Sequence, residues 1–77
     1  MVKILKYVVS SQNVPILFNS DVSHSYVANQ VSSAGFVIVN YDLEQDFFYV
    51  KCYGQSLTLG IGSNINDSEL IQNYLNK

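Results

Sequence analysis

The side chains able to act as a nucleophile or general base are few, since the chain has one histidine, His24, and one cysteine, Cys52. Any cysteine–histidine pair would have to use these two residues. Cys52 alternates in phase with Phe48 and Val50, and apolar surroundings make a thiol inert by raising its pKa. His24 is compatible with either a surface position or a neutral hydrogen-bonding role. We therefore predict no catalytic residue and treat His24 as a candidate for contact with a partner.

Two short segments share part of the pattern of known binding loops. Residues 42–46 place three acidic side chains at alternate positions, as a calcium loop does. Such a loop needs glycine at its sixth position and glutamate at its twelfth, where this chain has Phe47 and Tyr53. Gly60 and Gly62 lack both the Lys-Ser/Thr ending of a phosphate loop and the third glycine of a dinucleotide fingerprint. A hairpin tip and a backbone turn account for these residues, so we predict neither a metal nor a cofactor.

The most informative excess is aromatic, with six tyrosines and four phenylalanines in 77 residues. In an extended segment, side chains alternate between two faces. After the acidic residues, one face would carry Phe47, Tyr49, Lys51 and Tyr53, and the other Phe48, Val50 and Cys52. A large exposed aromatic patch usually marks an interaction surface. The candidate interaction surface comprises Tyr7, Tyr49, Lys51, Tyr53 and His24.

The elements that must position these residues begin with a β-hairpin. Residues 2–9 are rich in valine, isoleucine, leucine and tyrosine, which favour a strand. Residues 14–18 resume an extended pattern after a polar turn. Pro15 cannot donate a hydrogen bond to a neighbouring strand, so this second strand should lie at a sheet edge.

A short amphipathic helix is expected next. Polar residues 19–21 offer side-chain oxygens to a helix start, and apolar residues 22, 26, 27 and 31 follow at near-helical spacing. The helix should end near Gly35, which readily takes the left-handed cap conformation. Residues 36–41 and 47–53 are the clearest strands and the expected centre of the sheet, joined by the acidic hairpin loop. Residues 57–59 add an optional fifth strand.

The C-terminal helix has the best-defined start. Asn66 can cap it, Glu69 stands three residues on to complete a capping box, and Ile65 and Leu70 occupy the positions of a hydrophobic staple. Apolar residues 70, 71, 74 and 75 form the stripe that would pack on the sheet. The opposite side should face water and comprises Gln72, Asn73 and Asn76.

Together these elements predict one α+β domain over residues 1–77. The expected order is strand, strand, helix, strand, strand, optional strand and helix, with four to five strands in an antiparallel sheet. Chains of this kind usually place both short helices on one face of the sheet. That arrangement would leave Tyr7, Tyr49 and Tyr53 on an open face.

Composition and charge narrow the class of partner. The net charge of −2 offers no basic stripe for phosphates, which disfavours nucleic acid. The longest apolar runs, residues 36–39 and 47–50, are far shorter than a membrane span. Lysines interleave with apolar residues at the N-terminus, unlike a signal peptide. A single cysteine fits a reducing compartment, so we expect a cytoplasmic protein.

Three stretches carry a resemblance beyond these patterns. Residues 22–28, 33–36 and 52–60 read VSHSYVA, SAGF and CYGQSLTLG. Together with the closing segment 67–75, they make the chain resemble a group of short, uncharacterised bacterial and phage proteins. The resemblance implies a bacterial or phage origin. It attaches no activity, catalytic residue, ligand or cofactor to the chain.

Three hypotheses about function follow. The first is a non-enzymatic protein-interaction module, self-associating as a homodimer or binding another protein through the tyrosine-rich sheet face or the edge near Pro15. The second is a regulator encoded by a phage or mobile element that binds a host protein. The third is a small ligand-binding or enzymatic domain built around His24, Cys52 and residues 60–66, which requires the two side chains to approach hydrogen-bonding distance across a pocket.

Overall fold

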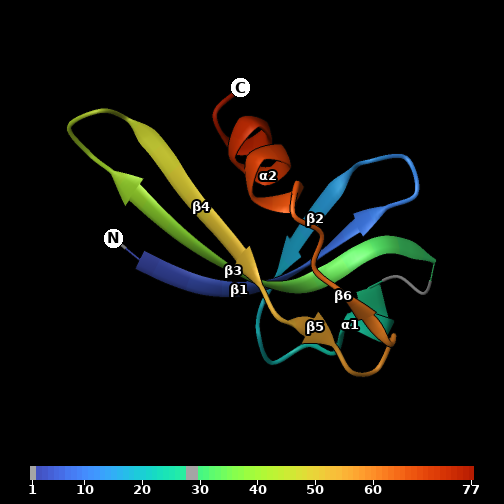
Figure 1. Ribbon diagram of the computed structural model, residues 1–77. Coiled ribbons are helices and arrows are strands. Elements are labelled where there is room, and N and C mark those ends of the chain that lie inside the picture. The colour runs from blue at the N-terminus through green and yellow to red at the C-terminus, as the bar shows by residue number, and fades with distance from the viewer. Residues whose placement is uncertain (1, 28–29) are drawn as a thin grey trace.

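The computed structural model describes residues 2–27 and 30–77 and is an α+β fold, as predicted (Figure 1). The strands and helices in chain order are β1 (Val2–Ser10), β2 (Pro15–Phe18), α1 (His24–Val27), β3 (Val31–Asp42), β4 (Phe47–Tyr53), β5 (Gln55–Ser56), β6 (Ile61–Gly62) and α2 (Asp67–Leu75). Strands β1 to β4 form an antiparallel sheet in the order β2-β1-β3-β4, and β5 and β6 form a separate two-stranded sheet.

The long strands β1 and β3 occupy the centre of the main sheet, with β2 and β4 at its edges. The edge position of the Pro15 strand is confirmed, since Pro15 lies opposite Val9 in a strand that has only β1 as a neighbour. The expectation that residues 47–53 lie at the centre of the sheet is wrong. An optional strand at 57–59 is also wrong, because this segment forms the turn between β5 and β6, completed by Gly60 with φ of 67°.

The first helix is much shorter than its apolar spacing predicted. α1 spans His24–Val27, residues 28–29 lie outside the described part of the chain, and β3 already begins at Val31. Gly35 therefore belongs to a strand and does not cap a helix. A Cβ atom at Gly35 would lie 2.6 Å from the carbonyl oxygen of Tyr53, closer than real Cβ contacts come. Glycine is needed here because two stretches of backbone approach each other closely.

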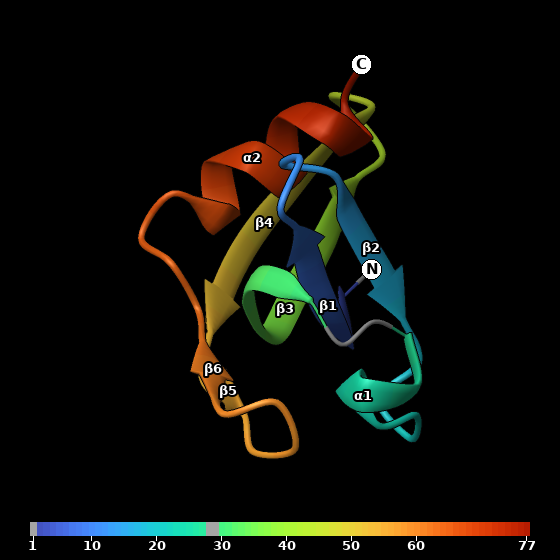
Figure 2. The ribbon, with the colours of Figure 1, turned by 90° about the vertical axis from the view of Figure 1, so that its right-hand side faces the viewer.

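The two helices pack on opposite faces of the main sheet (Figure 2). α2 covers the face that carries Tyr7, Val9 and Val37, and its own Ile71 completes this core cluster. α1 lies on the other face, where the ring of His24 contacts Phe18 and Phe36 at centroid separations of 5.5 and 6.0 Å. The predicted placement of both helices on one face is therefore wrong. We call the two sides the α2 face and the α1 face.

Polar side chains of α2 and of its C-cap residue, Asn76, hydrogen-bond to the outer edge of β4. Ser68 Oγ, Gln72 Oε1 and Asn76 Oδ1 accept the backbone N–H groups of Cys52, Val50 and Phe48 at 2.8, 2.9 and 2.8 Å. Four helical residues rise about 6 Å and two strand residues about 6.6–6.8 Å, so an antiparallel helix keeps this register for three successive bonds. The expectation that Gln72 and Asn76 face water is wrong, whereas Asn73 is exposed.

The start of α2 uses a capping box in a different register from the predicted one. Asn66 makes no side-chain capping hydrogen bond, and Ile65 is 94% exposed, so neither the predicted cap nor the staple forms. Asn64 Oδ1 accepts the N–H of Asn66, while Asp67 Oδ2 accepts the N–H of Asn64 at 2.8 Å. The reciprocal pattern is that of a capping box, two residues earlier. The same Asp67 carboxylate also accepts hydrogen bonds from the buried Tyr7 and Ser33.

Candidate functional site

His24 and Cys52 do not form a nucleophilic pair. His24 is buried on the α1 face, and its Nε2 donates to the carbonyl oxygen of Gly35 at 2.9 Å, since a carbonyl can only accept. Cys52 packs against the core cluster on the α2 face. Burial raises the pKa of the Cys52 thiol to about 11, which keeps it protonated at neutral pH. The geometric condition for an enzyme built on these two residues is not met, and His24 is not a surface contact.

Asp67 is an acidic residue whose side chain is buried. Its oxygens accept the Tyr7 hydroxyl at 2.5 Å, the Ser33 hydroxyl at 2.9 Å and the N–H of Asn64 at 2.8 Å. Desolvation, followed by the bond to Asp67, strongly raises the pKa of Tyr7. These contacts give both carboxylate oxygens a hydrogen-bond partner and tie α2 to the sheet. Tyr7 is fully buried, so its assignment to an open face is wrong.

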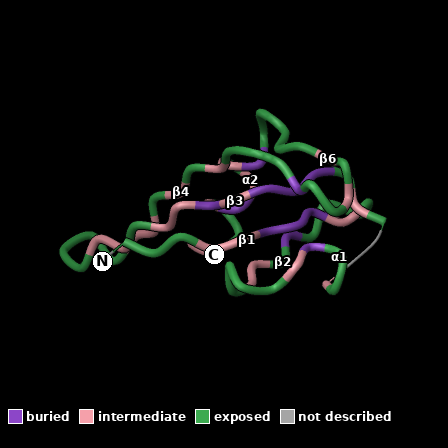
Figure 3. Tube along the Cα trace, turned by 90° about the horizontal axis from the view of Figure 1, so that it is seen from below, coloured by how far each residue is buried: buried purple, intermediate pink, exposed green. Residues whose placement is uncertain are grey.

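The α1 face is covered at one end only. Beside Phe36, a hollow of about 340 Å³ lies between α1 and the β5–β6 turn. Lys6 Nζ closes one side of it by donating to the carbonyl oxygen of Val22 at 2.9 Å, and Ser23 Oγ donates to Thr58 Oγ1 at 3.3 Å across another. These bonds fasten the covering segments to the sheet. Beyond Phe36, toward the β3–β4 turn, the same face is open (Figure 3).

The open part of the α1 face is built from two rows of cross-strand neighbours and from Tyr53, which lies opposite Phe36 in the adjoining row. Val2 lies opposite Asn40, which lies opposite Tyr49, and Ile4, Ile38 and Lys51 form the next row. Val2 is 63% exposed, Ile4 52%, Tyr49 44% and Tyr53 40%. We define the open patch as Val2, Ile4, Ile38, Tyr49, Lys51 and Tyr53.

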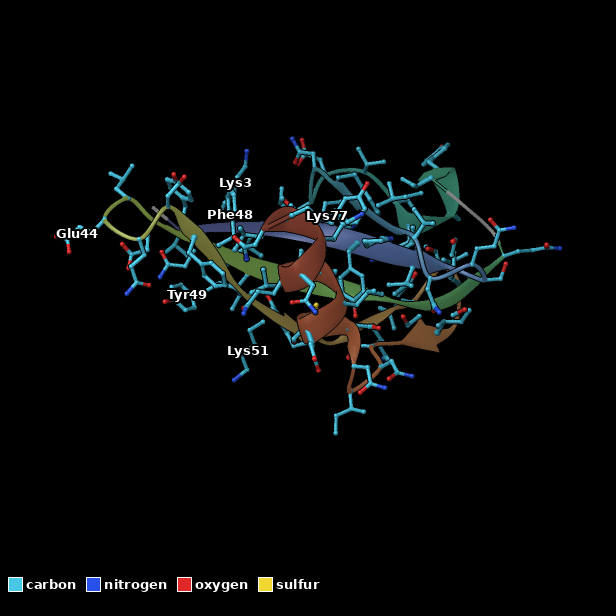
Figure 4. All side chains as sticks on the ribbon, turned by 90° about the horizontal axis from the view of Figure 1, so that it is seen from above. Lys3, Glu44, Phe48, Tyr49, Lys51 and Lys77 are labelled. Carbon is cyan, nitrogen blue, oxygen red and sulfur yellow. The ribbon has the colours of Figure 1, made fainter. Side chains whose placement is uncertain are left out.

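The structure places three of the five candidate interaction residues on the open patch. Figure 4 shows Tyr49 and Lys51 on one side of β4 and Phe48 on the other, as strand alternation requires. Tyr49, Lys51 and Tyr53 lie on the patch, while Tyr7 and His24 do not. Sequence reasoning missed Val2, Ile4 and Ile38. The signal for Val2 and Ile4 is the alternation of β1, in which even-numbered residues point away from the buried Tyr7, and Ile38 lies opposite Ile4.

Charge is distributed unevenly along the open face. Lys51 lies within the patch and Lys6 at the row of Phe36, whereas Asp42 lies beyond Asn40 at the β3–β4 turn. Asp42 Oδ1 accepts two backbone N–H groups of the turn, at 3.0 and 3.2 Å, and so remains fixed there. Within the open part of the face, Lys51 therefore lies nearer the covered end and Asp42 at the turn.

Comparison with known proteins adds no relative. No protein-family model matches the chain, and no curated protein or solved structure matches it. The described residues include no helix long and apolar enough to cross a membrane. Nor do those residues bring three or more histidine, cysteine, aspartate or glutamate side chains together as a metal site would.

Proposed function

We propose that this chain is a protein-interaction module that self-associates by apposing the open patches of two copies. The observation that carries the proposal is the exposure of Val2, Ile4, Tyr49 and Tyr53 on one uncovered sheet face. Aromatic and aliphatic side chains of this kind form the centres of homodimer interfaces. The sheet backbone holds them in place, so association costs little ordering of the chain.

The distribution of charge favours a second copy as the partner. Asp42 follows Ile38, which is in the row of Lys51, by four positions along β3, a distance of roughly 13 Å. A two-fold axis through the row of Asn40 would bring Lys51 of one copy toward Asp42 of the other. Opposite charges at the rim of an apolar contact set its register and disfavour other arrangements.

Sedimentation equilibrium over the micromolar range tests the proposal. Replacing Ile4 and Tyr49 by threonine, which keeps a good strand former at both positions, should weaken dimerisation by more than about tenfold. The matched control replaces Tyr26 and Leu57 by threonine, because these residues are 86% and 83% exposed but lie outside the patch. The control should dimerise like the wild type.

Two results would contradict self-association. One is a chain that stays monomeric throughout the micromolar range. The other is a control variant that loses as much dimer as the patch variant. Circular dichroism of both variants shows whether each keeps the fold, so that a loss of dimer can be assigned to the patch.

A further inference from the structure

The outer edge of β1 has no neighbouring strand along its first half. β2 pairs with β1 from Lys6 to Val9, whereas β3 pairs with it from Val2 onward. Within the part of the chain that the structure describes, nothing pairs with the outer side of residues 2–5. Figure 1 shows this half of β1 continuing past β2 toward the N-terminus. Unpaired backbone of this kind is a template for a further strand.

The free backbone groups can be assigned to particular residues. The N–H groups of Phe48, Val50 and Cys52 point outward to α2, so the alternate residues of β4 direct theirs to β3. The pairing of β4 with β3 and of β3 with β1 extends this alternation to β1. The N–H and C=O groups of residues 3 and 5 therefore point toward β3. The N–H and C=O groups of Val2 and Ile4 therefore point to the open side.

A groove lies beside this edge on the α2 face. It has a volume of about 250 Å³ and is lined by Lys3, Leu5, Leu17, Val39, Tyr41, Phe48 and Leu75. An enclosed apolar cavity of about 150 Å³ holds a benzene molecule, so the groove has room for one large apolar side chain. Lys3 is its only cation and is exposed. Figure 4 shows Lys3 and Phe48 on the side of β4 away from Tyr49 and Lys51.

We propose that the outer edge of residues 2–5 accepts an extended segment of another protein as an added antiparallel strand. Backbone hydrogen bonds to Val2 and Ile4 hold the segment. Its residue opposite Leu5 is apolar and enters the groove. Its residue two positions later lies opposite Lys3 and is acidic. The recognised pattern is thus apolar, any residue, acidic.

A second copy of this chain fits the edge poorly. Two-fold pairing of Val2 with Ile4 of another copy uses all the free backbone groups but sets Lys3 directly opposite the other Lys3, and like charges in that position destabilise a strand pair. Pairing Ile4 with itself avoids this clash. Only one pair of residues then exchanges hydrogen bonds, since β2 already occupies the position beside Lys6. An acidic segment from another protein has neither defect.

The inference rests on the chain being an interaction module but not on its self-association. The groove and Lys3 lie on the α2 face, whereas the open patch lies on the α1 face. Two copies joined through their patches would keep this edge accessible. The two proposals can therefore fail separately.

The test uses two blocked threonine-rich heptapeptides, each with a leucine followed two positions later by aspartate or by lysine. Amide chemical shifts of the isotope-labelled full chain report the binding. The aspartate peptide should bind about three- to tenfold more tightly, with the largest shifts at residues 2–5. Lys3→Glu should reverse the preference. The residue between leucine and aspartate lies opposite Ile4. Methylating the backbone nitrogen of this residue should abolish binding.

Equal binding of both peptides, or shifts centred away from residues 2–5, would overturn the edge proposal. The same titration on the Tyr49→Thr variant separates the two ideas. A peptide preference in a chain that never dimerises contradicts self-association alone. A dimer without a peptide preference contradicts the edge proposal alone.

Discussion

The two edges of the main sheet differ in what covers their outward-pointing backbone N–H groups. Along β4, the outward N–H groups are taken up by Ser68, Gln72 and Asn76 of α2. Along the first half of β1, the equivalent groups of Val2 and Ile4 have no such cover among the described residues. An unprotected edge invites pairing with another chain. The difference indicates that one edge is closed by the fold and that the other is available for binding.

The closed edge also shows that a polar stripe on a helix can bind a strand and need not face water. Residues at i, i+4 and i+8 share one side of a helix, and in an isolated helix such a polar side faces water. In α2 this side hydrogen-bonds to the backbone of β4, while the apolar Leu70, Ile71 and Leu75 pack on the sheet beside it. The helix therefore acts both as a cover for the core and as a substitute for a fifth strand.

The largest expected effect comes from undocking α2. Ile71 is fully buried in the core cluster, so Ile71→Ala should lower the free energy of unfolding by about 2–5 kcal/mol. Denaturant unfolding measures this loss. Hydrogen exchange at Phe48, Val50 and Cys52 should accelerate, because the helix that accepts their N–H groups is less firmly held. A shift of the unfolding midpoint within error would show that α2 contributes little to the fold.

A smaller effect isolates the edge contact itself. Gln72→Ala should cost about 1 kcal/mol, since it leaves the N–H of Val50 without its acceptor. This reverses the neutral effect that a water-facing Gln72 would give. Asn73→Ala, one residue away on the exposed side of α2, should stay within about 0.5 kcal/mol of the wild type. Equal unfolding midpoints for the two variants would contradict the role given to Gln72.

A further effect is a pH dependence at the closed edge. Burial raises the pKa of Cys52 from 9.0 to about 11, so the folded chain holds the thiol proton where the unfolded chain has lost it. Stability from this group is therefore complete below about pH 9 and falls as the pH rises to about 11. Tyr7, whose pKa is also raised, acts in the same direction. Cys52→Ala should flatten the decline between pH 9 and 10.5, measured by denaturant unfolding; an unchanged slope would contradict the burial of the thiol.

The spacing of apolar residues predicted those strands and helices whose pattern lies within their own sequence. β1, β2, β4 and α2 were found because alternation or helical spacing persists over their length, and Tyr49, Lys51 and Tyr53 followed from the phase of β4. The boundary between α1 and β3 was missed, since Val31 fits either a helical stripe or the start of a strand. Only pairing with Ser10 in β1 decides it.

The remaining errors arise from contacts distant in sequence. Tyr7 is in phase with Leu5 and Val9, which is a signal for burial, but its hydroxyl needed Asp67, sixty residues away, as a partner. Gln72 and Asn76 resemble ordinary surface residues until the edge of β4 is placed beside them. The open edge of β1 was equally hidden, because the length of β2 relative to β1 depends on where the chain leaves the sheet after Phe18.

Amide hydrogen exchange of the monomeric chain tests the contrast between the edges most directly. Along β1, Lys3 and Leu5 should exchange slowly because their N–H groups face β3, whereas Ile4 between them should exchange almost as fast as an unstructured peptide. On the closed edge, Val50 should exchange slowly although it also points outward. Slow exchange at Ile4, or fast exchange at Val50, would contradict the account of one closed and one open edge.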